Sequence, residues 1–288
     1  MALGLNKTKR RIASVTSTQK ITKAMGMVAT VKLKRFQDAF ENDHSYVSEL
    51  QRTLSAALHY DPAEASHYAK VNEEAEGNLY ILITSNLGLC AAYNSNLYSY
   101  LSRVADPEKD TILPLGNKGR SHLPFEGKYK NIRDDFKELD LSLDLRLIER
   151  AALVLKDDFN QKKYKRIYIL YTQYVNSLRF VPSLYQLLPL DLPYEPSPEE
   201  AWCPPLFEPG PRKLIHLLMP QYLGALFYAK SCEAQLSEQA ARRNAMDTAN
   251  DNADELLNKL TIEYNKARQA AITNEIVEVV SGSANQTK

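Results

Sequence analysis

The feature that most constrains this fold is a long C-terminal segment without a helix-breaking residue. From Ala225 to Ser281 the chain runs for 57 residues with neither glycine nor proline. As one α-helix this segment would extend about 85 Å, at roughly 1.5 Å per residue, which is more than an ordinary globular domain can bury. The segment therefore needs a partner helix along its length.

Both ends of the chain carry the apolar spacing of a coiled-coil seam. The C-terminal seam consists of Ala253, Leu257, Leu260, Tyr264, Ala267 and Ala271. Steps of three or four residues place these side chains on one face of a helix. The N-terminal segment from Leu5 to Asp61 contains no proline and one glycine, Gly26. Its seam consists of Phe36, Phe40, Val47, Leu50 and Leu54. Pro62 lacks a backbone donor, so this helix should end at Asp61.

Charge is distributed unevenly along the chain. The 288 residues have a formal net charge of +1, but residues 1–37 hold nine Lys or Arg and no acid. Between Glu233 and Glu278, nine acids outnumber five bases. This mild complementarity favours packing of the two terminal helices on each other.

The middle of the chain alternates between strand-like and helix-like patterns. Runs of β-branched and aromatic residues bounded by turn residues predict strands at 78–86, 111–116 and 166–175. Helical patterns lie between them, at 89–103 and 144–160. A further strand at 179–190 should be an edge strand, because Pro182 cannot donate to a ladder. Such alternation is typical of an α/β domain with a mostly parallel sheet.

These patterns predict an α/β fold class in which two long terminal helices form an antiparallel coiled coil, with a Rossmann-like α/β domain inserted between them. The expected boundaries are 1–61 for the N-terminal coiled-coil helix, 62–210 for the globular α/β domain and 211–288 for the C-terminal coiled-coil helix. The proline-rich stretch 192–211 is interpreted as a surface loop leading into the last helix.

The sequence offers little support for catalysis within this chain. The stretch SNLGLC at 85–90 follows a predicted strand, but Gly88 is a lone glycine and no phosphate-binding glycine motif is present; GNKGR at 116–120 is expected to be a turn. The three cysteines are few and far apart, and the five histidines show no metal-like or triad-like spacing. We therefore expect no catalytic residue, no cofactor and no bound metal. No apolar run approaches the roughly 20 residues that span a bilayer.

Two functions remain open from the residues alone: a basic coiled-coil protein that binds nucleic acid, or a coiled-coil scaffold. Nine basic residues in 37 could neutralise phosphates. Against this, apolar residues interleave those charges at helical spacing, and no aromatic residue precedes Phe36 to stack on bases. The interleaved residues are Ile12, Val15, Met25, Val28 and Leu33.

Three stretches of this sequence resemble the signatures of a known family in the order in which that family carries them. They are ITKAMGMVATVKLKRFQ (21–37), ITSNLGLCAAYN (83–94) and the long run from AMDTANDNADELL to EIVEVVSGSA (245–284). All three are similar to the gamma subunit of F-type ATP synthases. The chain departs from the family pattern at Gly26, at Asn86-Leu87, where the family usually has Asp-Arg, and at Ala91.

The resemblance implies a mechanical role rather than a catalytic one. In that family the subunit is the central-stalk rotor. Its coiled coil enters the hexamer of alpha and beta subunits, and its globular foot, with epsilon (delta in mitochondria), grips the membrane ring of c subunits. Proton-driven rotation is thereby coupled to ATP synthesis, or hydrolysis to reverse rotation. The resemblance further implies a peripheral position on the cytoplasmic face of a bacterial inner membrane, reached through the complex only, and no nucleic-acid partner.

The resemblance also implies partner contacts at individual positions. Contacts with the catalytic subunits are implied at Lys20, Lys23, Met25, Arg242, Arg268, Gln269, Thr273 and Glu275. Contacts with the c ring are implied at Phe207 and Glu208. Without the resemblance, polar residues on a helix face would be read as simply solvated.

Overall fold

The structure is a computed structural model that describes residues 2–139, 144–196, 200, 202–203 and 205–286. Within the terminal helices, the side chains of residues 2–4, 42–44, 275 and 278–286 lie outside that description. The chain divides into two compact units: unit 1 comprises Met1–Thr30 and Arg242–Lys288, and unit 2 comprises Val31–Ala241. Each unit is described by itself below.

Two long helices run through both units. Helix α1 spans Ala2–His59 and helix α7 spans Pro211–Gln286. The structure begins α7 14 residues before Ala225, and Pro220 lies inside the helix. After α1, Asp61 starts a new helix, α2 (Pro62–Ala69), because its carboxylate accepts the Glu64 N–H at 3.2 Å.

Unit 2 contains a five-stranded sheet with the order β3-β2-β1-β4-β5. Its strands are β1 (Leu79–Ile83), β2 (Thr111–Leu115), β3 (Asn131–Ile132), β4 (Ile167–Asn176) and β5 (Arg179–Leu188). The β1–β2, β1–β4 and β2–β3 pairs are parallel, while β4 and β5 form an antiparallel pair. The predicted mostly parallel sheet and the edge position of the 179–190 strand are therefore both confirmed.

The helices between the strands are α3 (Tyr93–Val104), α4 (Asn117–Glu126), the 3-10 helix η1 (Lys137–Leu139) and α5 (Leu145–Asn160). The expectation of a turn at GNKGR was wrong, because these residues open α4. Gly116 precedes that helix with φ +92°, and a Cβ there would lie 2.3 Å from the Thr84 carbonyl oxygen. Only glycine fits this close approach of two backbone segments.

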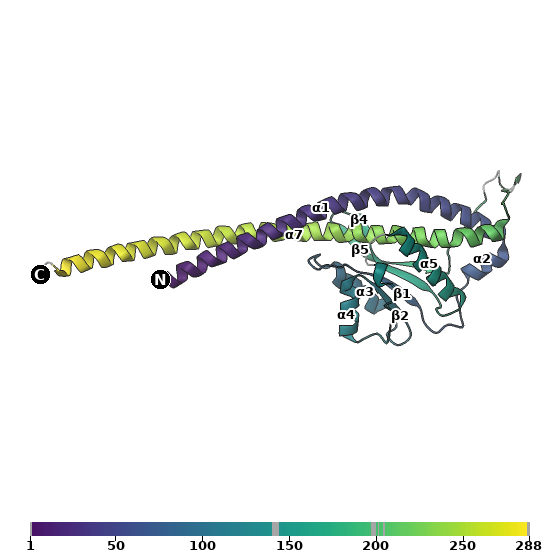
Figure 1. The fold of residues 1–288 in the computed structure, drawn as a ribbon, viewed down its shortest axis with the longest axis horizontal. Coiled ribbons are helices and arrows are strands. Elements are labelled where there is room, and N and C mark those ends of the chain that lie inside the picture. The colour runs from purple at the N-terminus through teal and green to yellow at the C-terminus, as the bar shows by residue number, and fades with distance from the viewer. Residues whose placement is uncertain (1, 140–143, 197–199, 201, 204, 287–288) are drawn as a thin grey trace. The chain divides into compact units, whose positions relative to one another are not determined.

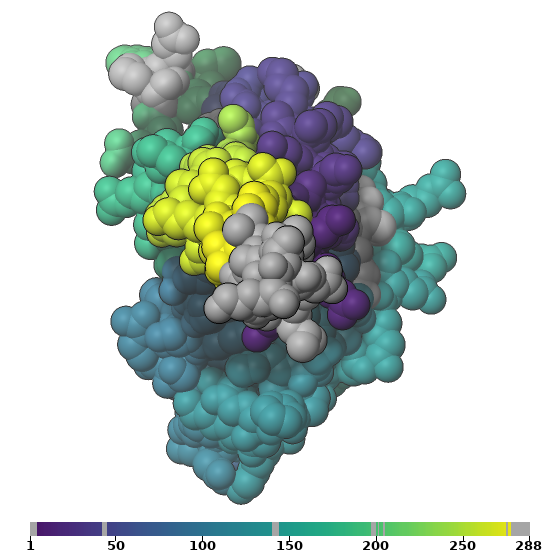
Figure 2. All heavy atoms as spheres, turned by 90° about the vertical axis from the view of Figure 1, so that its left-hand side faces the viewer, coloured from purple at the N-terminus to yellow at the C-terminus, as the bar shows by residue number. Residues whose placement is uncertain are grey.

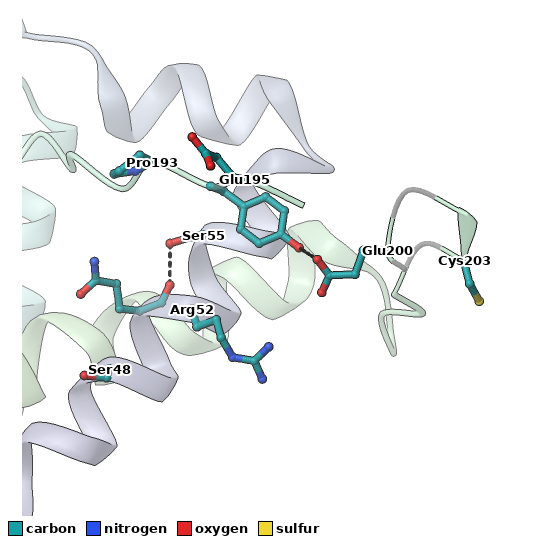
Figure 3. Close-up of a pocket in the computed structure, with 9 residues that line it drawn as sticks. Ser48, Arg52, Ser55, Pro193, Glu195, Glu200 and Cys203 are labelled. Carbon is teal, nitrogen blue, oxygen red and sulfur yellow. Dashed lines mark hydrogen bonds between the residues drawn. The ribbon is translucent and has the colours of Figure 1, made fainter. Parts of the chain in front are cut away.

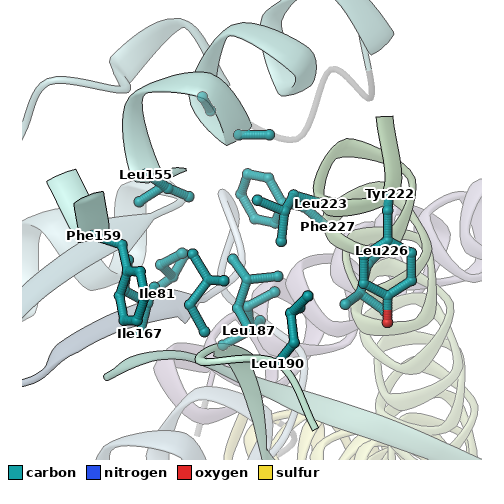
Figure 4. Close-up of a cluster of buried hydrophobic side chains, with 14 of the residues drawn as sticks. Ile81, Leu155, Phe159, Ile167, Leu187, Leu190, Tyr222, Leu223, Leu226 and Phe227 are labelled. Atoms are coloured by element: carbon teal, nitrogen blue, oxygen red, sulfur yellow. The ribbon is translucent and has the colours of Figure 1, made fainter. Parts of the chain in front are cut away.

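The main core of unit 2 lies where α5 and α7 cover one face of the sheet (Figures 1 and 4). Leu155 and Phe159 from α5 meet Leu223 and Phe227 from α7 over strand residues such as Ile81. Each of these side chains is at most 2 % exposed. Such burial is worth about 1.5–3 kcal/mol per large apolar side chain, and it holds α7 against the sheet despite Pro220.

Candidate functional site

The two terminal helices pair in unit 1 through a seam that is partly polar. The Gln19 amide donates to the Asp254 carboxylate at 2.6 Å, and the Thr22 hydroxyl donates to the Asn250 side-chain oxygen at 2.5 Å. One turn further along α1, a Cβ on Gly26 would meet the Met246 Cβ at 3.5 Å. Partner numbers fall in α7 as they rise in α1, so the pair is antiparallel (Figure 1). In the end-on view of Figure 2, the purple residues of α1 lie beside the yellow residues of α7.

The seam turns the basic residues of α1 outward. Residues 19, 22, 26 and 29 are buried or half-buried, whereas Lys20 and Lys23 between them are exposed. Four more exposed basic side chains lie nearer the N-terminus: Lys7, Lys9, Arg10 and Arg11. Met25 is half-buried beside the seam. With no acid before Asp38, this part of α1 is positively charged and would attract an acidic partner.

Exposed apolar side chains on the same helices were not predicted as contact residues. Ile21, Met27 and Val28 on α1 are 56–68 % exposed, and Ile262, Ile272 and Ile276 on α7 are 48–58 % exposed. Val28 is one of the apolar residues that interleave the charges, but it points away from the seam. Helical periodicity could have predicted that Val28 is exposed, because it immediately precedes Ala29, which holds a seam position.

The C-terminal group of implied contact residues lies on α7. Arg268, Gln269 and Thr273 are all exposed, and no ion pair is recorded for Arg268 within the described residues. The Thr273 hydroxyl donates to the Gln269 carbonyl of its own helix at 3.0 Å. The side chain of Glu275 lies outside the described residues, although its backbone belongs to α7. The spacing of the other three puts them on neighbouring turns of one helix.

The remaining implied contacts differ from one another in exposure. Arg242 is only 6 % exposed, unlike the other implied basic contacts. Phe207 is half-buried and packs against the main core of unit 2, where its ring lies 5.6 Å from that of Tyr60. Glu208 next to it is exposed, and Leu206 is 90 % exposed. The turn before α7 therefore anchors one aromatic ring and presents its neighbours outward.

A hollow of about 960 Å³ lies beside this turn in unit 2 (Figure 3). It lies between α1, which contributes Arg52 and Ser55, and the proline-rich stretch, which contributes Tyr194, Glu195 and Glu200. The Tyr194 hydroxyl donates to Glu200 at 2.8 Å. These side chains do not form a nucleophile and base pair of the kind that hydrolytic catalysis needs.

Helix α4, which follows β2, leaves no free backbone donor in its first turn at the sheet edge where α/β enzymes bind nucleotides. Strand β1 lies at the topological switch point, because β2 and β4 flank it on opposite sides. At its carboxyl end the first N–H groups of α4 are already bonded. Asn117 N donates to the Asn86 side chain at 2.9 Å, Lys118 N to the Ser85 carbonyl at 3.0 Å and Gly119 N to the Thr84 hydroxyl at 2.8 Å. No donor of that turn is left to hold a phosphate.

The displaced pKa values also fail to indicate acid–base catalysis. Burial raises the pKa of Tyr98 to about 12, with a further contribution from Cys90. Burial likewise raises the pKa of Tyr129 to about 12, with contributions from Glu126 and Asp110. These shifts move both hydroxyls further from neutral pH, whereas a general base needs a pKa near it. Tyr129 is buried and Tyr98 half-buried, and both pack in a second apolar cluster of unit 2.

In the part of the chain that the structure describes, no cluster of three or more His, Cys, Asp or Glu side chains is arranged to hold a metal ion. Nor is any helix in those residues both long and apolar enough to cross a membrane.

Comparison with known proteins gives a consistent result over nearly the whole chain. The ATP synthase family profile matches residues 4–285. The ATP synthase gamma chain of Halothermothrix orenii is 36 % identical over 283 residues, covering 96 % of each chain. That of Mycoplasma mobile is 36 % identical over 284 residues, covering 97 % of this chain and 98 % of the relative.

Solved structures share the fold at lower identity. A chain in the Euglena gracilis mitochondrial ATP synthase, in the structure of its OSCP, F1 and c-ring parts, has a TM-score of 0.66 and 19 % identity, covering 99 % of this chain and 95 % of the other. A chain of the rotor of the same synthase has a TM-score of 0.63 and 22 % identity, covering 94 % of this chain and all of the other. The arrangement of an α/β domain between two long helices is thus shared with these chains.

Proposed function

This chain belongs to the ATP synthase gamma chain family, and from that premise we propose how its parts divide the work of a central-stalk rotor. The chain is a non-catalytic subunit of an F-type ATP synthase, whose catalytic sites lie in other subunits. We propose that the paired helices of unit 1 contact the alpha and beta subunits. The α/β domain of unit 2, in the same proposal, contacts epsilon and the membrane ring of c subunits.

The physical basis of the rotor function is the asymmetry of the paired helices. One side of α1 carries exposed Lys20 and Lys23, while α7 carries more acids than bases. Inside a hexamer of alternating subunits, such a shaft makes a different set of contacts with each catalytic subunit. Differential contacts of this kind can shift otherwise equivalent subunits into different conformations. Rotation driven by protons through the c ring then changes each subunit in turn, and ATP hydrolysis reverses the rotation.

The single observation that carries the contact proposal is the outward-facing basic surface of α1. Lys20 and Lys23 are exposed and form no ion pair within the described residues. The seam bonds of their neighbours Gln19 and Thr22 fix the orientation of the helix that carries them. We propose that they meet an acidic loop of the catalytic subunits, together with Met25 and the exposed apolar Met27. Opposite charges steer such contacts and fix their register.

A second group of contacts is proposed near the end of α7, at Arg268, Gln269, Thr273 and Glu275. Charge-assisted bonds from this group to the catalytic subunits would hold the rotor at a resting angle and break on each step. Arg242 is included in the proposal. Because its side chain is 6 % exposed, it offers a partner far less surface than Arg268 does.

For the opposite end of the rotor we propose contact with the c ring at Phe207 and Glu208. The turn that holds them also presents Leu206 and Trp202, each at least 90 % exposed. As functional segments we propose 1–61 and 211–288 for the two coiled-coil helices and 62–210 for the foot domain. The complex is membrane-associated, and we propose that this chain lies at the cytoplasmic face of a bacterial inner membrane, held there by its partners.

The contact proposal can be tested by placing a photo-crosslinking residue at Lys23 in the assembled complex. The matched control is Lys109, an exposed lysine in the α/β domain of unit 2. We expect the probe at Lys23 to form a product with an alpha or beta subunit and the probe at Lys109 to form none. An intact, ATP-hydrolysing complex in which Lys23 gives no product with either subunit would contradict the proposal.

A further inference from the structure

Helix α7 is buried on all sides over residues 231–241, although many of its side chains there are polar. The polar residues of this stretch are each at most 6 % exposed: Ser231, Glu233, Gln235, Ser237, Glu238 and Gln239. Helices buried on all sides are ordinarily apolar, because an unpaired polar group loses its bonds to water on burial. The polar character of this stretch therefore calls for a reason beyond packing.

A charged pair on α7 binds the sheet at strand β4. The Lys230 ammonium donates to the Tyr171 hydroxyl and to the Glu233 carboxylate, both at 3.0 Å. The other oxygen of Glu233 accepts the backbone N–H of Tyr174 at 3.3 Å. Burial alone would lower the pKa of Lys230, but Glu233 and Tyr171 raise it above its ordinary value, so the ammonium stays charged at neutral pH. One ion pair thus joins α7 to a side chain and to the backbone of β4.

Two further bonds extend this connection along the same side of α7. The Ser237 hydroxyl, which is fully buried, donates to the Thr172 carbonyl at 2.9 Å. The hydroxyl of Tyr93, the first residue of α3, donates to the Ala234 carbonyl at 3.1 Å. Positions 230, 233, 234 and 237 follow the spacing of one helix face. We call Lys230, Glu233, Ser237 and Tyr93 the polar joint.

Packing alone does not secure α7 at this point. A cavity of about 310 Å³ adjoins the joint, lined among others by Phe40, Gln51, Gln173, Tyr185 and Lys230. A void on one side of a helix removes the contacts that would oppose its displacement. Apolar contacts are also non-directional, whereas hydrogen bonds weaken steeply when their geometry is bent.

From this geometry we infer that the polar joint locks α7 against rotation relative to the sheet, so that torque passes between the α/β domain and the helix. Lys230, Glu233, Ser237 and Tyr93 are in this account positioning residues. The inference rests on the rotor function, because only a torque-bearing subunit needs a directional connection here. Along the chain, α7 continues from the joint into unit 1 without a break.

The test uses the assembled catalytic sector with a bead attached to this chain at Cys203, which is exposed, whereas Cys90 and Cys232 are buried. The variant Lys230→Met, Glu233→Leu, Ser237→Ala removes both charges together and leaves no unpaired buried ion. We expect the bead to show a wider spread of angles during each dwell, because thermal spread increases as torsional stiffness falls. A spread equal to that of the unaltered chain would overturn the inference.

The urea midpoint of the triple variant is measured in parallel, because this variant would unfold more easily if the replaced side chains only stabilised the fold. Replacing a buried ion pair by apolar side chains is often neutral or stabilising, so we expect the urea midpoint of the triple variant to be unchanged or higher. The control is Leu223→Ala on the same helix, a fully buried side chain of the main core that does not line the cavity beside the joint. It should lower the urea midpoint and leave the angular spread unchanged; an equal widening there would count against the polar joint.

A milder variant keeps the inference testable if the triple variant fails to fold. Ser237→Ala removes a single hydroxyl and its bond to the Thr172 carbonyl. It should widen the angular spread as the triple variant does, but by a smaller amount. An unchanged angular spread would refute the inference that the polar joint locks α7. Failure of the unaltered complex to rotate would instead contradict the rotor function itself.

Discussion

Gly26 provides a quantitative test of the antiparallel pairing in unit 1. It lies inside α1 and faces α7, where an added Cβ would meet the Met246 Cβ at 3.5 Å and an Asp247 carboxylate oxygen at 3.9 Å. Both distances are ordinary van der Waals contacts. A methyl group therefore fits between the helices without moving either one, and Gly26→Ala should be tolerated.

The expected size of the effect follows from helix propensity. Alanine in a helix interior is favoured over glycine by about 1 kcal/mol, and no steric penalty offsets this at the distances above. A gain of about 1 kcal/mol in local stability slows hydrogen exchange by about fivefold where exchange proceeds through local opening. We therefore expect about fivefold slower exchange of the α1 amides around residues 19–30 in the full chain.

A matched control is Gly224→Ala in α7. Its added Cβ would meet the Glu149 side chain at 3.6 Å and the Ala152 Cβ at 4.0 Å, which again leaves room for a methyl group. This variant should slow exchange in unit 2 and leave residues 19–30 unaffected. Faster exchange around Gly26 in the Gly26→Ala variant would show that the helices approach more closely than 3.5 Å allows, and it would refute the seam described here.

Three other substitutions probe different parts of the fold. Gly77→Ala should lower the free energy of unfolding by about 1–3 kcal/mol, and with it the urea midpoint, because an added Cβ would lie 2.1 Å from the Lys109 carbonyl oxygen. An unchanged urea midpoint would contradict that close approach. Burial alone would raise the pKa of Asp135, but Arg133 holds it below its ordinary value of 3.8. The pair therefore stabilises the fold fully above about pH 4 and loses its effect as pH falls further, so Asp135→Asn should flatten the fall of the urea midpoint in acid. Ala253→Pro should cost about 3 kcal/mol or more and reduce the far-ultraviolet helical signal; full helicity with unimpaired coupling would contradict the paired-helix account.

Much of this fold follows from local patterns in the sequence. The two long helices were predictable because their apolar residues recur at helical spacing over many residues. The strands at 78–86 and 166–175 were predictable because runs of β-branched and aromatic residues lie between turn residues. The boundary of the last helix was expected at 211, after the proline-rich stretch, and α7 begins at Pro211. Pro220 and Gly224 argue against a helix locally, and the burial of Met219, Tyr222 and Leu223 against the sheet overrides them.

Hydrogen bonds between residues far apart in the sequence account for the other differences between the predicted and the observed structure. Residues 116–120 have the sequence of a turn, yet α4 begins there. It can begin there because Thr84, Ser85 and Asn86, about 30 residues earlier, accept hydrogen bonds from its first N–H groups. The polar joint could not be predicted from the sequence, for a related reason. Glu233 and Ser237 read as an exposed helix face, and only the fold shows that a sheet and a second helix cover them.

The implied contact residues could be predicted only through the family resemblance, because exposed polar residues on a helix have no local signature of function. What the structure adds is their arrangement. It places Lys20 and Lys23 outside a seam formed by Gln19 and Thr22, and it shows exposed apolar neighbours such as Met27 that the sequence did not single out.

The most direct test of the rotor function is to watch this chain turn. The catalytic sector is assembled with this chain, anchored to a surface through its beta subunits, and observed through a bead attached at Cys203 while ATP is supplied. The account predicts unidirectional rotation in discrete steps that stops when ATP is withdrawn. A complex that hydrolyses ATP at its normal rate while the bead stays at one angle would contradict it.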